Sequence, residues 1–507
     1  MHARVQYPQD IEPLVQFIEE TDPAEILDRT LEKLRGGIAP RTMLTASALA
    51  VVRSSDLPPG HHGGSLHPLA GLHAIAKLSG RLDGEDRFLP ILQHVALSNK
   101  HIHDPETSPF SLLEFAPLDP GGAELSRTAD LAADGAGEAA TAEGVAAAKA
   151  AFLKACSRGE SNKADHIFLW LWDHVPAIEA FDLLLSMALP KNALDDHYFI
   201  LPGYLWRGLE TLGAEHLRVL MRPAVRYVAR FPTQKNIPEI DAVIEEHGLL
   251  RRVLRERTGD DETGKIGEVG EAIGRVDAYA EIPVLLAKGL VAGLSLEGAG
   301  EALSIGAASL FLRSLTGNPM DVHLHTSVNL RRYLVGLKGL SMRNRLLALL
   351  TWHTGPEIRS TQNRMMPAPQ PDPQAVAALP PRAQDELLEA ITQSILTQPP
   401  TDWSQVTNLG AMRAVPEVRG TVNLAQQYVN CRYDPQVLID RLAQLVCHDN
   451  FTEMHAFKHH QAVIEEFNAT REPWRWMHLV CGCQAAAISF GKDMSLYEDL
   501  LELLHAA

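Results

Sequence analysis

The sequence predicts an all-α fold, and two observations support this prediction. Apolar residues recur at helical spacing in many segments of the 507 residues, as in AEILDRTLEKLRGG at 24–37, where a Gly-Gly pair marks the end of the helix. Strand-like alternation is scarce, Asn-Gly is absent, and the two Asp-Gly pairs lack the flanking alternation of a hairpin. We therefore expect about 15–20 helices of ordinary length. They would form one large multi-helix globular domain over residues 1–507, with a metal site built from facing helices.

Two segments interrupt the helical pattern. Residues 117–148 are rich in Ala, Gly and acidic residues, which predicts an insertion or linker that leads into a helix near 145–156. Residues 361–382 are rich in proline and predict a non-helical loop, either a surface belt or a lid. Between and around them, helical periodicity is clear in five further segments, at 216–231, 343–353, 385–396, 435–448 and 494–507.

The composition narrows the function classes. The formal net charge of −17 disfavours a nucleic-acid binder, which needs a basic face. The five cysteines form no C-x-x-C pair, so we expect neither a disulfide framework nor a structural zinc site, and a cytoplasmic location. The N-terminus lacks a secretory signal. The most apolar long stretch, 281–312, is interrupted by charged residues and predicts buried helices, with no membrane partner.

Histidines are numerous, at 22, and several fall where helices are expected to begin. His67 precedes Pro68, a residue suited to a first helical turn, so the positive end of the helix dipole should keep this imidazole neutral. A neutral imidazole is the form that binds a metal. His62 stands before two glycines that allow the chain to turn back towards His67. We predict His67 and His62 as metal ligands, and a polar loop is the alternative.

Two more segments add candidates. His197 follows two aspartates that either set its tautomer or simply begin a helix. His323 and His325 follow Asp321 in the expected first turn of another helix, and we expect only one of the two to face the core. We predict His197, His323 and His325 as further candidate metal ligands.

The last candidates lie near the C-terminus. His455 and Lys458 are three residues apart, and His455 and His459 are four apart, so each pair shares a helix face. A protonated lysine repels a metal, so Lys458 must be neutral, turned away or converted. Reaction of its neutral amine with carbon dioxide would give a carbamate, an anionic oxygen ligand. A solvated polar helix face is the alternative interpretation.

Three of these motifs resemble the questin-oxidase-like family, a largely helical group of oxygen-using enzymes that act on polyketides. The matching pieces are His67-Pro68 with LAGLHAIAKLSG, His323-Leu-His325-Thr326 with SVNLRR, and His455-Ala-Phe-Lys458. The resemblance implies a non-haem iron site and either oxygen insertion into, or oxidative cleavage of, an apolar aromatic or polycyclic substrate, with dioxygen as co-substrate. The family's association with NADPH has no counterpart in a G-x-G-x-x-G motif here.

The residue types agree with this chemistry at a coarse level. Several neutral imidazoles and one anionic oxygen suit Fe(II), with Mn(II) or Zn(II) as alternatives. Two other functions remain open. One is a zinc-dependent hydrolase with Asp321 or Asp449 as general base, and the other is a helical interaction scaffold without catalysis.

Overall fold

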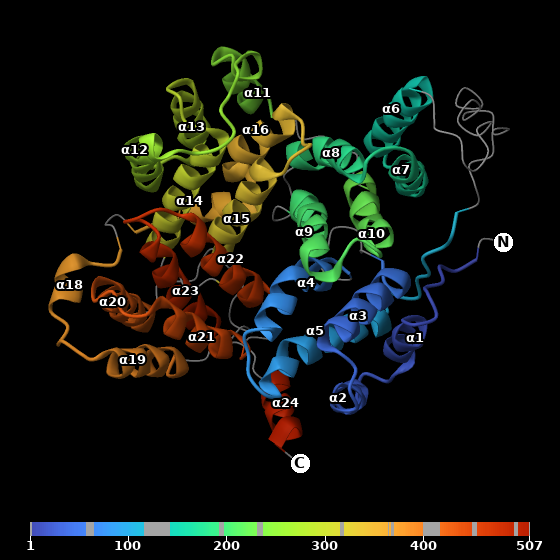
Figure 1. The fold of residues 1–507 in the computed structure, drawn as a ribbon, viewed down its shortest axis with the longest axis horizontal. Coiled ribbons are helices and arrows are strands. Elements are labelled where there is room, and N and C mark those ends of the chain that lie inside the picture. The colour runs from blue at the N-terminus through green and yellow to red at the C-terminus, as the bar shows by residue number, and fades with distance from the viewer. Residues whose placement is uncertain are drawn as a thin grey trace. The chain divides into compact units, whose positions relative to one another are not determined.

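The computed structural model shows a helical protein (Figure 1), as the sequence predicts. It describes residues 3–56, 65–115, 142–191, 197–230, 237–314, 319–363, 365–366, 370–398, 416–448, 454–490 and 495–505. Within those ranges the chain forms 24 α-helices and no β-strand, apart from an isolated antiparallel bridge between Arg4 and Leu113. The number of helices exceeds the expected 15–20 partly because it includes short ones such as the seven-residue α17 (Pro356–Gln362).

The helices group into two compact units. Unit 1 comprises residues 1–73, 95–237 and 338–344. Its helices are α1 (Glu12–Glu20), α2 (Ile26–Arg35), α3 (Pro40–Ser54), the first half of α4 (Leu66–Ser79), most of α5 (Leu89–His103), α6 (Ala142–Arg158), α7 (Ser161–His174), α8 (Ala177–Ala188), α9 (His197–Leu212) and α10 (Leu217–Arg230).

Unit 2 comprises residues 74–94, 238–337 and 345–507. Besides α17 and the remaining parts of α4 and α5, its helices are α11 (Pro238–Glu246), α12 (Thr263–Arg275), α13 (Ile282–Val291), α14 (Leu296–Arg313), α15 (His323–Gly336), most of α16 (Met342–Leu350), α18 (Pro373–Ala377), α19 (Gln384–Leu396), α20 (Pro416–Asn430), α21 (Pro435–Val446), α22 (His455–Ala469), α23 (Trp476–Ser489) and α24 (Ser495–His505).

Unit 1 is held together around α7 and α10, which pack along one another. The buried Arg222 of α10 donates three hydrogen bonds to the carboxylate of Asp165 on α7. A second buried guanidinium, that of Arg53 on α3, bonds Glu12 and Glu19 of α1. Each charge is buried together with its partner, which limits the cost of removing it from water.

The centre of unit 2 is α14, a helix of small and apolar residues that packs against α12, α15 and α23 (Figure 1). Glycines allow the close approach of α12 and α14. A Cβ atom placed at Gly306 would overlap Ile273, and one at Gly270 would press on Ile305. Helices α22 and α23 then pack side by side, and α15 lies against α22. The histidine-bearing helices α15, α22 and α23 are therefore neighbours in one core.

The predicted interruptions have mixed outcomes. Residues 116–141 lie outside the described range, whereas 142–148 already belong to α6, so the helix expected near 145–156 is confirmed and begins earlier. The prediction that 361–382 is non-helical is wrong in part, because α18 lies within it. Proline favours the first helical position, Pro373 occupies it, and the Asp372 side chain accepts a hydrogen bond from the backbone N–H of Gln374.

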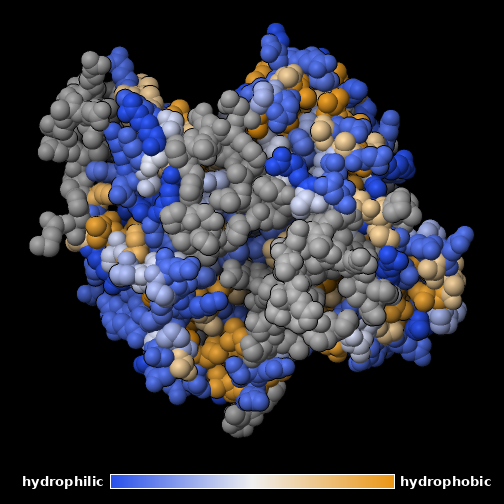
Figure 2. Space-filling model, turned by 180° about the vertical axis from the view of Figure 1, so that it is seen from behind, coloured by the Kyte–Doolittle hydropathy of each residue, from blue (hydrophilic) through white to orange (hydrophobic). Residues whose placement is uncertain are grey.

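The described surface on the face shown in Figure 2 is mostly hydrophilic, with smaller hydrophobic patches between the polar areas. Among the described residues, no helix is both long and apolar enough to cross a membrane.

Candidate functional site

A pair of buried histidines joins two helix starts in unit 2. His323 is the first residue of α15 and His455 is the first residue of α22. Their Nε2 atoms lie 3.1 Å apart, and their rings meet edge to face with centroids 4.8 Å apart. Both side chains are buried. The sequence predicted both residues as metal ligands, and the structure brings them together although they are 132 positions apart in the chain.

The proton position on His323 follows from its second contact. Its Nδ1 lies 2.8 Å from the backbone carbonyl of Met320. Because a carbonyl oxygen can only accept, Nδ1 carries the hydrogen and donates it, which leaves a lone pair on Nε2 of the neutral ring. A ring nitrogen anchored to a carbonyl while the other points at a shared site is the usual arrangement of a metal-binding histidine. The His323 lone pair is directed at Nε2 of His455.

The separation of the two nitrogens fits a common metal ion. Bonds from imidazole nitrogen to zinc are about 2.0–2.1 Å long, and similar lengths hold for other divalent transition metals. Two such ligands therefore lie about 3.0 Å apart at a right angle and about 3.4 Å apart at the tetrahedral angle. The 3.1 Å observed between His323 and His455 is close to the right-angle value of octahedral coordination. A direct hydrogen bond between the two rings is equally compatible with this distance.

Unit 1 contains a second pair of the same kind. His67 is the second residue of α4, with Pro68 in the first turn as the sequence predicts, and His197 is the first residue of α9. Their Nε2 atoms are 3.4 Å apart, with ring centroids at 5.3 Å, and both side chains are buried. This separation matches two ligands at the tetrahedral angle. Both pairs thus present Nε2 atoms from the first turn of a helix, where the dipole disfavours imidazolium.

His325 does not share the environment of His323. Its Nδ1 lies 3.1 Å from Nε2 of His459, and its Nε2 lies 2.9 Å from Nδ1 of His478. Nε2 of His478 is in turn 3.1 Å from the hydroxyl of Thr470. Since both ring nitrogens of His325 are engaged, it is better placed to support the site than to bind a metal. The expectation that only one of His323 and His325 faces the core is wrong, because α15 is buried on every side from His323 to Arg331.

Burial keeps the three imidazoles of this hydrogen-bonded histidine chain, His325, His459 and His478, uncharged. It lowers the pKa of His325 to about 4 and holds the pKa values of His459 and His478 well below the ordinary value. Neighbouring imidazoles add to the effect on His459 and His478. All three rings are therefore neutral at physiological pH, and each has one N–H donor and one acceptor for the chain of hydrogen bonds.

One carboxylate lies beside the chain. Glu466 of α22 is buried and accepts hydrogen bonds from Ser304, Asn329 and Arg332, the last of which is also its ion-pair partner. Burial alone would raise its pKa, but Arg332, His478 and the Ser304 hydroxyl together lower the pKa to about 2. The pair therefore contributes no net charge to the interior that surrounds the histidines.

Lys458 is buried, at 5% exposure, one turn along α22 from His455. The solvated helix face that the sequence left open is excluded here, since every described side chain from His455 to Ile464 is buried. His455 and His459 nevertheless contact different partners, His323 and His325 respectively.

Sequence reasoning missed several members of this cluster. A lone histidine in an apolar segment, such as His478, is typically a core residue with one hydrogen bond, but His478 has two. Glu466 and Arg332 were not singled out at all. A sequence signal exists for Glu466, because it follows His455 by eleven residues, three helical turns, and so shares its side of α22. His62, Asp195, Asp196 and Asp449 lie outside the described residues.

Comparisons with known proteins add no family. No protein-family model, no curated protein and no solved structure matches this chain.

Proposed function

We propose that this protein is a non-haem, metal-dependent oxygenase. It would bind Fe(II) and either insert oxygen into an aromatic or polycyclic small molecule or cleave it oxidatively. The observation that carries the proposal is the His323–His455 pair, with Nε2 atoms 3.1 Å apart and Nδ1 of His323 donating to Met320. The reaction class comes from the resemblance of three motifs to the questin-oxidase-like enzymes, which adds dioxygen chemistry to the metal-binding geometry.

The protein's own residues would prepare the site. The Met320 carbonyl fixes the ring of His323, so that its Nε2 lone pair is aimed before any ion arrives. His323 and His455 would hold the iron through two nitrogen atoms and would leave room for other ligands. When bound, such an iron supplies the one-electron and dioxygen chemistry that side chains lack. Burial of both histidines keeps bulk water from the reacting centre.

The neighbouring hydrogen-bonded histidines would keep positive charge away from the metal. Each of His325, His459 and His478 has a lowered pKa, so no imidazolium adds positive charge near the cation. Arg332 is neutralised by Glu466. A divalent metal therefore meets no uncompensated positive charge from these groups.

Lys458 would provide the anionic ligand. Its neutral amine attacks carbon dioxide, a C–N bond forms, and one proton leaves, which gives a carbamate oxygen in place of an ammonium. The side chain is buried, and the reaction requires its amine in the neutral form.

Metal analysis of purified protein tests the proposal. We expect about one iron per chain after anaerobic loading with Fe(II), and loss of most of it in H323A and H455A. H247A is the matched control, because His247 is also in unit 2 and also contacts a backbone carbonyl through Nδ1, that of Val243. H197A measures the contribution of the unit 1 pair in the same assay.

Nitric oxide then tests for dioxygen-accessible iron without knowledge of the substrate. The EPR signal of a high-spin iron–nitrosyl should form in the wild type and in H247A but not in H323A. Tightly bound zinc, together with no consumption of oxygen, would contradict the oxygenase proposal and favour a zinc-dependent hydrolase. If the folded protein bound no metal, the contact between His323 and His455 would be a hydrogen bond only, and the proposal would be overturned.

Lys458 has its own test. With ¹³C-bicarbonate, a carbamate resonance should appear in the wild type and be absent from K458A. Propionate, a small carboxylate that fits the space left by the side chain, should restore iron binding to K458A. Full iron binding by K458A without propionate would remove Lys458 from the site while leaving the histidine pair in place.

A further inference from the structure

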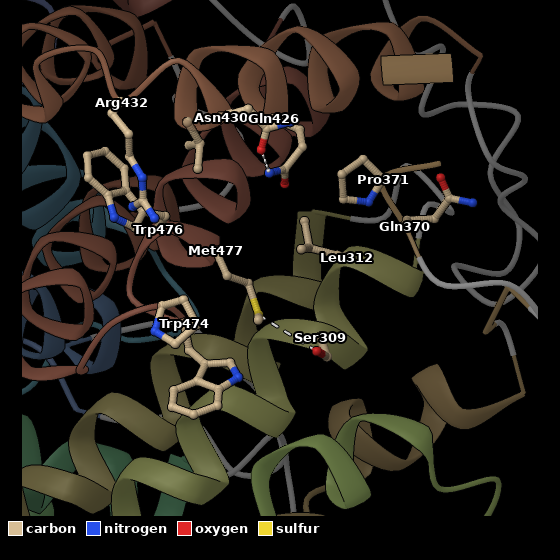
Figure 3. Close-up of a pocket in the computed structure, with 12 residues that line it drawn as sticks. Ser309, Leu312, Gln370, Pro371, Gln426, Asn430, Arg432, Trp474, Trp476 and Met477 are labelled. Atoms are coloured by element: carbon tan, nitrogen blue, oxygen red, sulfur yellow. Dashed lines mark hydrogen bonds between the residues drawn. The ribbon is translucent and has the colours of Figure 1, made fainter. Parts of the chain in front are cut away.

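Unit 2 contains a cavity of about 490 Å³ between α14, α20 and the start of α23 (Figure 3). This volume lies within the range of about 300–1,000 Å³ typical of small-molecule sites. Trp474, Trp476 and Met477 line one side, and Leu312 lies on α14. The cavity is separate from the histidine pairs, since none of its lining residues belongs to them.

Its polar lining consists mainly of primary amides. Gln426 donates to the side-chain oxygen of Asn430 at 2.8 Å, one turn along α20, and Gln370 is a further lining residue. Each amide offers two N–H donors and a carbonyl acceptor without a net charge. Such a set suits a neutral ligand whose groups both donate and accept, as hydroxyls do.

The aromatic side of the cavity is itself held in place. The guanidinium of Arg432 lies 4.7 Å from the ring centroid of Trp476, and the indole N–H of Trp476 donates to Glu472. Trp474 packs against Gly267, where a Cβ atom would overlap its ring. The indole surfaces are therefore preorganised, which reduces the entropy lost when a ligand binds.

A second cavity of about 400 Å³ adjoins the first, because Ser309 and Gln370 line both. Apart from Gly274, the residues that line this second cavity all have polar or charged side chains, among them Glu271, Asp277 and Arg275. A carboxylate accepts hydrogen bonds from hydroxyl groups at both of its oxygens, and a guanidinium group donates several hydrogen bonds. An extended ligand would thus meet indole and amide groups first and charged groups next.

We propose that these two adjoining cavities form a binding site for a neutral saccharide of about two rings. One sugar ring would place its C–H face on the indole side and its hydroxyls on the amides, and the next would reach Asp277 and its neighbours. A flat aromatic molecule is the competing ligand. It would satisfy the indoles but leave the polar second cavity without hydrogen-bond partners, at a cost for each group that loses water.

Saturation-transfer NMR and calorimetry with cellobiose test the proposal on the full chain stripped of metal by chelation. We expect a Kd of about 1 mM, a range in which both methods work. Q426L should weaken cellobiose binding about tenfold. Q393L is the matched control, because Gln393 is an exposed helical glutamine with the same i,i+4 side-chain hydrogen bond, to Glu389, and lines neither cavity.

Two further arms separate the alternatives. D277A should weaken binding of cellobiose but not of methyl β-glucoside, whose single ring occupies the indole side. Binding of 2-naphthol without binding of cellobiose would identify an aromatic site and overturn the proposal. Binding of neither probe, or equal losses in Q426L and Q393L, would also overturn it. None of these outcomes bears on metal binding, since the protein tested is metal-free.

Discussion

Nε2 of His325 lies 2.9 Å from Nδ1 of His478, and the two rings are nearly parallel, with an angle of 4° between their planes. Neither ring is accessible to solvent. Because α15 carries one and α23 the other, this contact ties together two helices that are 153 residues apart at these positions. Because each neutral ring has one donor and one acceptor, the direction of this hydrogen bond is coupled to those of the contacts with His459 and Thr470.

Replacement of His325 should therefore be costly. H325A removes one buried hydrogen-bond partner from each of His459 and His478 and opens a cavity, so we expect the free energy of unfolding to fall by about 2–5 kcal/mol. H325L restores the volume and should recover only part of the loss. Urea denaturation of both variants measures this, with H174A as control, since His174 is a half-buried histidine at the end of α7. Wild-type stability of H325L would show that the hydrogen bonds contribute nothing.

Stability should decrease between about pH 6.5 and pH 4. Burial lowers the pKa of His325, His353 and His448 to about 4 in the folded protein. Below about pH 6.5 the unfolded chain takes up protons at these rings while the folded chain does not, so each contributes a loss of up to about 1.4 kcal/mol per pH unit. Above pH 6.5 both states are neutral and the contribution is constant.

Denaturation at a series of pH values checks this slope. The H353N variant should show a shallower dependence than the wild type over pH 4–6.5, by roughly one proton. Glu466 affects stability at lower pH. Because its pKa is lowered to about 2, its stabilising contribution is lost between about pH 4.5 and pH 2. An unchanged slope in H353N would mean that His353 is protonated in the folded protein.

The helices themselves could be predicted because helical periodicity is a local property. The segments expected at 385–396 and 435–448 correspond closely to α19 and α21, whose apolar stripes face one side. The site was harder to predict from the sequence. Helices α15 and α22 are buried on all sides, so they have no apolar stripe that distinguishes an inward from an outward face. For His323 and His455 the sequence indicated the residue and the helix start. That they face one another is a property of the fold.

Partners from separate helices could not be predicted for the same reason. His478 follows an apolar tryptophan segment that looks like ordinary core, and only its contacts with His325 and Thr470 show its role. The five-residue α18 was missed because proline count outweighed the Asp-Pro start signal at Asp372.

Removing the charge of Glu466 should destabilise the fold strongly. E466Q leaves the largely buried guanidinium of Arg332, whose side chain is 11% exposed, without its counter-charge, and breaking a buried pair typically costs about 3–5 kcal/mol. The exposed pair Glu271–Arg275 provides the control, because E271Q should change the unfolding free energy by less than about 0.5 kcal/mol. Thermal and urea unfolding compare the two variants. Equal losses of unfolding free energy in E466Q and E271Q would show that burial does not strengthen the contribution of the Glu466–Arg332 pair.

Two glycines of α12 give opposite predictions from the same substitution. A Cβ atom at Gly267 would overlap the indole of Trp474, whereas one at Gly264 meets nothing within 4 Å. G267A must displace Trp474 from the small core cluster that it covers, so we expect a loss of about 1–3 kcal/mol. G264A should be neutral or stabilising by up to about 1 kcal/mol, because alanine favours helix and restricts the unfolded chain.

The variants G267A and G264A also test the proposed saccharide site, since Trp474 lines the larger cavity. G267A should weaken cellobiose binding by displacing the indole, and G264A should leave it unchanged. Chemical denaturation and calorimetry of both variants provide the two measurements. A G267A protein as stable as G264A would mean that Trp474 moves without cost, and its role as a fixed wall of the cavity would then be lost.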